Sequence, residues 1–161
     1  MNFKNELISL YNQFPTDVNL FKEESICSKI NISDNNPDIE DICDVLIFPK
    51  IINTKLIKTS SGISNEGQKL TGNKLFVELS ISLNIRYISN QVVKNICCEN
   101  YEIKKNTYIS LPEIIDEKNI MDIFKLSRVN VTPFVEHYYT RLLDNRSFTI
   151  SMLLLLDVKS Y

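Results

Sequence analysis

The stretch LFVELSISLNIRYI, residues 75–88, decides the fold of this chain. Every second residue in it is apolar, which is the pattern of one face of an extended strand: Leu75, Val77, Leu79, Ile81, Leu83, Ile85 and Tyr87. A helix would distribute these residues around its circumference. At about 3.3 Å per residue the stretch would span roughly 46 Å, about twice the length of an ordinary strand. We therefore expect a central strand that is bent or bulged.

The composition favours sheet over helix and one domain over several. The sequence contains no alanine, the best helix former, whereas β-branched isoleucine is abundant. A length of 161 residues suits a single domain with an additional arm. The net charge of −2 gives no general attraction to nucleic acid or to an anionic membrane, so neither is expected as a partner.

The sequence shows no segment suited to secretion or to crossing a membrane. The beginning of the chain, MNFKNELISLYNQF, carries charges early and lacks an apolar run of secretory length. The longest late apolar run, residues 152–156, is far too short to cross a bilayer. We expect synthesis in the cytoplasm of the producing cell and no membrane insertion.

The N-terminal part of the chain is expected to be a short helical arm. Residues 2–14 place apolar side chains at helical spacing and are followed by Pro15. The weakly amphipathic residues 21–30 would also be compatible with a second helical turn or two. The polar, turn-forming segment ISDNNPDIED, residues 32–41, marks the boundary. This divides the chain into an arm, 1–36, and a β-domain, 37–161.

Within the β-domain, residues 45–59 read as a strand in which Pro49 indicates an edge position or a bulge. Residues 60–73 hold all three glycines and predict a long connection. Two more strands are expected at 92–98 and 101–111. Residues 113–126 mix apolar and charged side chains, which leaves a helix and an irregular excursion equally open.

The last part of the chain predicts a hairpin. Residues 129–143 and 148–159 flank LDNRS, a run of turn-forming residues. In the last strand, Leu153 and Leu155 make the second face apolar as well as the first. That face must be covered by the N-terminal arm, by the 113–126 excursion or by another subunit. Together these strands predict a mainly β fold, an antiparallel β-sandwich or barrel-like domain.

The four cysteines contain no C-x-x-C pair, so neither a zinc ribbon nor a thioredoxin-type motif is indicated. Cys97 and Cys98 are adjacent in an expected strand, where their side chains would point to opposite faces. One interpretation is that the cysteines are buried, reduced thiols. The other is that they cross-link subunits in a surface assembly. The candidate interface residues are Leu153, Leu155, Cys97, Cys98 and Cys27.

No catalytic, cofactor or metal site is predicted from the motifs. The run GISNEGQK, residues 62–69, lacks the Lys-Ser/Thr ending of a phosphate-binding loop and reads as a plain loop. His137 is the single histidine, and it suits a partly buried structural role better than that of a catalytic base. The acidic residues of segment 34–44 lack the central glycine of an EF-hand. Three lysines in segment 50–58 have no aromatic platform for nucleic acid beside them.

Several segments, in order and at fitting spacings, resemble the SPOCS (spore coat assembly) domain family of clostridia and their relatives. The resemblance covers about residues 37–158 and rests on these runs: 37–40, 51–54, 56–59, 66–72, 74–75, 85–88, 109–112, 131–136 and 143–148. It implies a non-enzymatic β-domain used in endospore morphogenesis. It also implies synthesis in the mother-cell cytoplasm and a later position in the spore coat or at the spore surface, where the cysteines become exposed to oxidation.

We therefore expect a structural protein without cofactors that associates with itself, as a homo-oligomer, lattice or fibre, and with other spore coat proteins. The alternative is a carbohydrate- or peptidoglycan-binding β-module of the spore or cell envelope, because tyrosines offer stacking faces for sugars: Tyr87, Tyr101, Tyr108, Tyr138 and Tyr139. An enzyme is the least supported class, since no base, nucleophile and orienting group can be named from the spacing.

Overall fold

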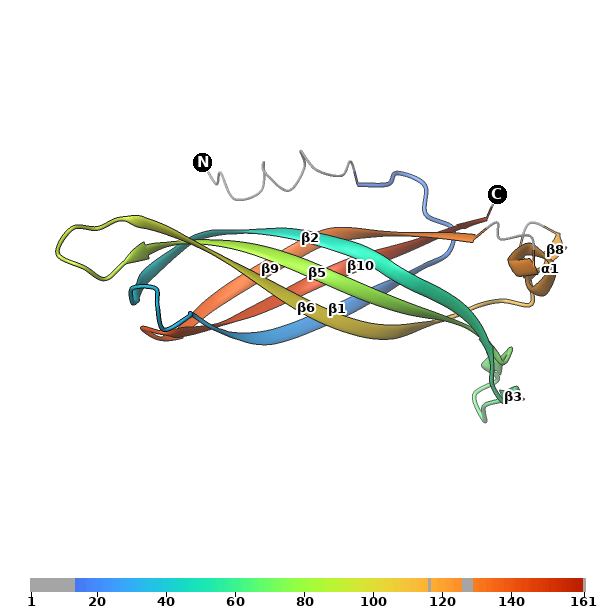
Figure 1. The fold of residues 1–161 in the computed structure, drawn as a ribbon. Helices are drawn as coiled ribbons and strands as arrows, with labels where there is room; N and C mark the ends of the chain where they lie inside the picture. The colour runs from blue at the N-terminus through green and yellow to red at the C-terminus, as the bar shows by residue number, and fades with distance from the viewer. Residues whose placement is uncertain (1–13, 116, 126–128, 161) are drawn as a thin grey trace.

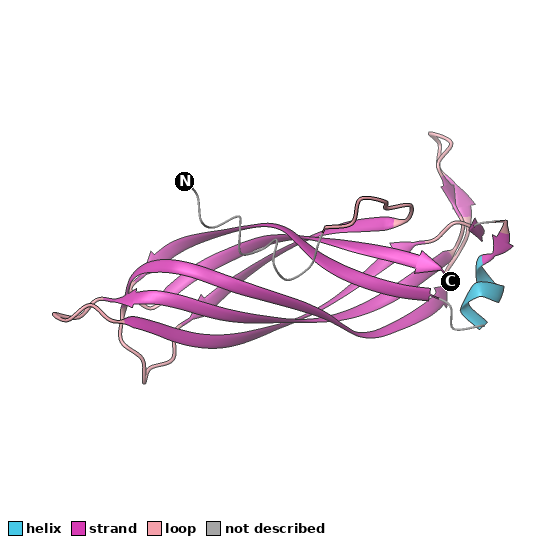
Figure 2. Cartoon of the chain, turned by 90° about the horizontal axis from the view of Figure 1, so that it is seen from above, coloured by secondary structure: helices cyan, strands magenta, loops and turns pink. Residues whose placement is uncertain are grey.

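A computed structural model describes residues 14–115, 117–125 and 129–160. Its elements, in chain order, are β1 Phe21–Asn31, β2 Ile39–Lys58, β3 Gly62–Ile63, β4 Lys69–Leu70, β5 Asn73–Ser89, β6 Ile96–Ser110, β7 Ile114–Ile115, β8 Lys118–Asn119, α1 Ile120–Lys125, β9 Val129–Asp144 and β10 Ser147–Ser160. The six long strands run along one axis, and α1 lies at one end of the molecule (Figures 1 and 2).

The six long strands form two antiparallel sheets of three strands each, with the orders β1-β10-β9 and β2-β5-β6. The sheets face each other, as Figure 1 shows, so the fold is a β-sandwich. At its two sides, β2 approaches β9 and β1 approaches β6. The expectation of a mainly β, antiparallel fold is confirmed.

The core lies between the two central strands, β5 and β10. The alternate residues of β5 predicted to share one face, from Leu75 to Tyr87, are each at most 1% exposed. Phe148, Ile150, Leu154 and Leu156 of β10 meet them with no exposed surface. Burying one such side chain contributes roughly 1.5–3 kcal/mol, so these two strands contain most of the hydrophobic stabilisation.

Strand β5, which contains residues 75–88, is central in its sheet, as predicted. The irregularities that accommodate its length, however, lie in its neighbour β2. Register shifts occur in β2 between Ile42 and Asp44 and between Ile51 and Asn53, where β2 has one residue more than β5. Pro49 lies on β2, which is an edge strand of its sheet. An edge position is where the missing N–H of proline is tolerated.

The prediction of helical turns around residues 21–30 is wrong, and these residues belong to the sandwich. Phe21–Asn31 forms β1, which pairs with β10 along its whole length. Ile26 and Ile30, both buried, are four residues apart, a spacing that suits one face of a helix and one face of a strand equally. Pairing with β10 decides between them, so residues 21–31 are not a separate arm. The helix predicted for 2–14 lies outside the described residues except for Phe14, which is not helical.

The two strands expected at 92–98 and 101–111 are one strand, β6, which begins at Ile96 and ends at Ser110. Glu99 and Asn100 do not break it, because both pair with residues of β5. The segment after β6 contains a helix, α1, which is one of the two alternatives left open, and before it a short antiparallel pair of strands, β7 and β8, which was not predicted. The hairpin of β9 and β10 is confirmed.

Candidate functional site

The outer face of the β1-β10-β9 sheet, the side turned away from the core, contains the two predicted interface leucines. Leu155 is only 4% exposed, whereas Leu153 is partly buried. Leu155 lies opposite Phe134 of β9, and the ring of Phe14 packs edge-on against Phe134 with 5.9 Å between centroids. The segment that precedes β1 therefore covers part of this face, one of the three coverings expected from the sequence.

The cysteines do not gather in one place. Cys27 is exposed on the outer face of the β1-β10-β9 sheet, where the hydroxyl of Ser151 donates to its sulfur at 3.5 Å. Cys98 is exposed on the other sheet, opposite Arg86, whereas Cys97 packs against the core. The two adjacent thiols thus point to opposite faces, as predicted. All four cysteines lie in the described part of the chain and none forms a disulfide there.

On the outer face of the β1-β10-β9 sheet, strand register brings four side chains into two neighbouring rows. Leu153 lies opposite His137, and Ser151 lies between Cys27 and Tyr139. Tyr139 is 61% exposed, and Cys27 and His137 are exposed too. We call Cys27, His137, Tyr139 and Leu153 the Tyr139 surface. A surface of this kind, with an aromatic ring, an aliphatic side chain and a thiol, suits contact with another protein.

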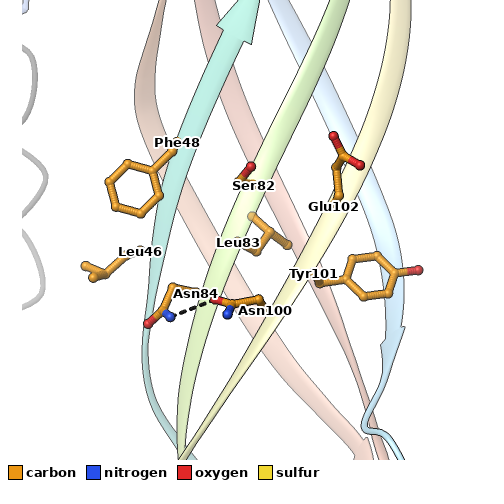
Figure 3. A pocket seen from close by; sticks show the side chains of 8 residues that line it. All are labelled: Leu46, Phe48, Ser82, Leu83, Asn84, Asn100, Tyr101 and Glu102. Carbon is orange, nitrogen blue, oxygen red and sulfur yellow. Dashed lines mark hydrogen bonds between the residues drawn. The ribbon is translucent and has the colours of Figure 1, made fainter.

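The outer face of the β2-β5-β6 sheet holds a shallow depression of about 640 Å³. Its lining comes from all three strands (Figure 3): Leu46 and Phe48 of β2, Ser82, Leu83 and Asn84 of β5, and Asn100, Tyr101 and Glu102 of β6. The Asn84 side chain donates from Nδ2 to Oδ1 of Asn100 at 2.8 Å. The Ser80 hydroxyl donates to Oε1 of Glu102 at 2.5 Å.

This depression was not predicted from the sequence, because its residues come from three strands whose register the sequence does not reveal. The one available signal was the polar alternation Ser80, Ser82, Asn84 on the side of β5 opposite the core. Amide, hydroxyl and carboxylate groups beside apolar side chains can bind a polar, hydroxyl-rich ligand through hydrogen bonds. His137 lies on the other sheet, so it does not take part in this site.

The five tyrosines considered for sugar stacking differ in accessibility. Tyr87 has no exposed surface, and its hydroxyl donates to the carbonyl of Pro37 at 3.1 Å. Burial raises the pKa of Tyr87 to about 12, and burial also raises the pKa of the partly buried Tyr138. Tyr87 therefore cannot supply a stacking face. Tyr101, Tyr108 and Tyr139 are exposed, and only Tyr101 borders the depression.

The acidic segment after β1 is held by one arginine of the β9–β10 turn. Arg146 donates from Nη1 to the carbonyl of Asn36 at 2.7 Å and to Asp38 at 2.9 Å. It also donates from Nη2 to the carbonyl of Ser33 at 2.7 Å. The acids thus belong to a turn fastened to the hairpin. Among the described residues, no group of three or more His, Cys, Asp or Glu side chains is placed to hold a metal ion.

These observations define a class: an antiparallel β-sandwich that presents two broad sheet faces. Comparison with protein-family models, with curated proteins and with solved structures gives no match to this chain. Within the described ranges, no helix has the length and apolar character needed to span a membrane.

Proposed function

We propose that this chain is a non-enzymatic structural protein of the endospore coat or spore surface that acts by self-association and by binding other coat proteins. The resemblance to SPOCS domains supplies the biological setting, synthesis in the mother-cell cytoplasm followed by assembly on the spore. The mainly β architecture agrees with what that resemblance implies. The molecular basis proposed for association is contact between sheet faces.

The single observation that supports association best is the Tyr139 surface. A half-buried leucine and an exposed tyrosine adjoin there on the rigid outer face of a sheet. Tyrosine is enriched at protein interfaces because its ring buries a large area while its hydroxyl keeps a hydrogen bond. Cys27 lies in the same row as Tyr139, with Ser151 between them. Two copies that meet at this surface with their two-fold axis near Cys27 would bring exposed thiols together, and oxidation would then cross-link them.

Sedimentation velocity over a range of concentrations, under reducing conditions, tests this proposal. We expect the wild type to associate and the double variant Leu153→Ser/Tyr139→Ser to associate clearly more weakly at the same concentration. Thr149→Ala on the same sheet is the control and should associate like the wild type. A wild type that stays monomeric at high concentration, with and without oxidant, would contradict the proposal.

The role of the cysteines is tested on non-reducing gels and by electron microscopy after mild oxidation. We expect Cys27→Ser to remove covalent dimers, whereas Cys97→Ser should leave them, because Cys97 packs against the core.

In a sporulating host, a fluorescent fusion is expected to move from the mother-cell cytoplasm to the spore surface. A fusion that stays diffuse through sporulation would argue against a coat protein.

A second candidate function is binding of a carbohydrate or peptidoglycan strand, and the depression of the β2-β5-β6 sheet favours it. Asn84, Asn100 and Glu102 offer amide and carboxylate groups to sugar hydroxyls, and Tyr101 borders them. Titration calorimetry with soluble cortex or cell-wall fragments tests this function. Binding that is lost in Asn100→Ala would support it, and no heat change with any fragment would remove it.

A further inference from the structure

The charges of the β2-β5-β6 sheet separate along its length. Strand pairing places Ser82 in a row with Phe48 and Glu102, and Ile81 in a row with Pro49 and Ile103. A line between these two rows divides the sheet into two halves. The half that contains the β5–β6 turn has five carboxylates and one arginine, a net charge of −4: Glu40, Asp41, Asp44, Glu99, Glu102 and Arg86. The other half has six lysines and one carboxylate, a net charge of +5: Lys50, Lys55, Lys58, Lys74, Lys104, Lys105 and Glu78.

Part of this charge is compensated within the chain. Asp44 forms a two-pronged ion pair with Arg86, Glu40 pairs with Lys94, and Lys105 lies 3.6 Å from Glu24 of β1. The structure records no ion pair for Lys50, Lys55, Lys58, Lys74 and Lys104 within the described residues, nor for Asp41, Glu99 and Glu102. Glu99 accepts hydrogen bonds from the backbone N–H of Ser33, and Glu102 accepts one from the hydroxyl of Ser80. The charges open to a partner are therefore the exposed lysines on one half and Asp41 and Glu102 on the other.

Most of these charges lie on the outer face, in rows set by strand register, whereas Glu99, opposite Ile85, and Lys58, opposite Asn73, lie on the side that faces the core. Lys50 and Lys104 flank Ser80 in one row. The row of Ser82 carries Glu102, and Asp41 pairs with Ile88 further along. Side chains on one face repeat about every 6.6 Å along a strand. The lysine rows therefore lie beyond one end of the depression, whereas Glu102 lines it and Asp41 lies beyond its other end.

We propose that this face binds the same face of a second copy in antiparallel orientation, so that the acidic half of each copy lies on the lysine half of the other. The inference rests on the proposed self-association and adds a surface and a geometry to it. A surface that carries both signs in nearly equal amount is complementary to itself after a two-fold rotation. A partner of one sign, such as a polyanion, would be repelled by the other half.

The two faces of the sandwich would then have different roles. The β1-β10-β9 sheet would contribute an apolar contact at the Tyr139 surface, and the β2-β5-β6 sheet would contribute an electrostatic contact on the opposite side. A subunit with two such two-fold contacts on opposite sides binds one neighbour on each side. The row of subunits can then grow in both directions, which gives an open assembly rather than a closed dimer. This is the kind of growth that a coat layer or a fibre requires.

Charge reversal tests the proposal with two variants of the full chain. The first is Asp41→Lys/Glu102→Lys in the acidic half, and the second is Lys50→Glu/Lys104→Glu in the lysine half. All four side chains are exposed, and circular dichroism and thermal unfolding verify that both variants fold. Lys29→Glu/Arg141→Glu, on the exposed surface of the other sheet, is the matched control for the second variant, because it changes the net charge by the same amount and in the same direction.

Self-association is measured by sedimentation velocity, with Leu153→Ser/Tyr139→Ser as background so that only the electrostatic contact remains. We expect each reversed variant to associate about tenfold more weakly or worse, since like charges then face each other. An equimolar mixture of the two reversed variants should associate again. Association should also weaken on going from about 50 to about 500 mM salt, because exposed charges are screened.

The outcomes separate this inference from the proposed function. Restored association in the mixture supports it. Charge-reversed variants that associate as strongly as Leu153→Ser/Tyr139→Ser itself overturn it. Heparin serves as a model polyanion: a chain that binds heparin through its lysine half and stays monomeric overturns the inference too. If the wild type associates and only Leu153→Ser/Tyr139→Ser prevents it, the inference fails while the proposed self-association stands. A wild type that is monomeric under all conditions overturns both.

Discussion

Gly72 is the glycine whose replacement is expected to cost the most stability, because of its backbone conformation and its surroundings. Its φ is +76°, in the left-handed region, and an added Cβ would lie 2.6 Å from the carbonyl oxygen of Thr59. The same glycine accepts a hydrogen bond from the N–H of Thr59 at 2.8 Å, which closes the connection between β2 and β5. Gly72→Ala should lower the free energy of unfolding by roughly 2 kcal/mol or more, from the left-handed strain and the collision together. Urea unfolding measures this loss.

The other two glycines provide graded controls for that measurement. Gly67 has a φ of +82° with nothing within 4 Å, and Gly62 has neither constraint. Gly67→Ala should therefore cost about 1 kcal/mol from conformation alone, and Gly62→Ala close to nothing. Equal losses at all three positions would show that the collision with Thr59 does not matter. The sequence predicted a glycine-rich connection but could not rank the glycines, because their φ values depend on which strands the connection joins.

At the scale of elements, β1 and β6 belong to different sheets and are joined by side-chain hydrogen bonds and ion pairs rather than by backbone hydrogen bonds. Thr107 donates to Glu24 at 2.6 Å, and Lys22 forms an ion pair with Glu24 at 2.8 Å. Burial by itself would raise the pKa of Glu24, but the hydrogen bonds from Lys22 and Thr107 and the charges of Lys22 and Lys105 lower it below 4.5.

This contact predicts a pH-dependent stability. A carboxylate whose folded pKa is depressed stabilises the fold above its unfolded pKa, and that contribution is lost as the pH falls through the folded pKa. Glu24→Gln should lower the free energy of unfolding by about 1–3 kcal/mol at neutral pH. The difference from wild type should shrink as the pH falls below about 4.5. Urea unfolding at several pH values checks this, with the exposed Glu23→Gln as the control that should show no such loss.

The strand β10 is covered on both faces around Leu155, and this gives a second prediction at the scale of elements. Leu155→Ala should lower the free energy of unfolding by about 2–5 kcal/mol, because its side chain is buried although it points away from the core. Leu153→Ala, at a partly buried position, should cost clearly less and mainly weaken association. Equal losses of stability, measured by urea unfolding, would show that the covering around Phe14 and Phe134 does not shield Leu155.

At the scale of the whole molecule, the sandwich should be most rigid along its two central strands. Both β5 and β10 have a hydrogen-bonded neighbour on each side and a fully buried inner face. Their amides should exchange with solvent on the order of tenfold or more slowly than those of the edge strands β1, β2, β6 and β9. Hydrogen exchange followed by mass spectrometry tests this order. Equal protection in β2 and β5 would contradict it.

Much of the fold was predictable from particular stretches of sequence. The alternation from Leu75 to Tyr87 predicted a central strand, and LDNRS predicted the last hairpin, because each signal is local. Residues 21–31 were misjudged because Ile26 and Ile30 fit a helix and a strand equally well until β10 is beside them. The depression around Asn84 and Asn100 needed the register of three strands, which no local pattern contains.

The sequence by itself determined which side chains point inward, since alternation along an extended chain depends only on backbone geometry. The tertiary structure alone decided which strands are neighbours. It therefore decided that Cys27 shares a face and a row with Tyr139, that Cys98 lies on the opposite sheet, and that lysines and carboxylates separate along one face. The physical reason is that pairing between strands distant in the chain is selected by burial of the whole core, a property that no single segment possesses.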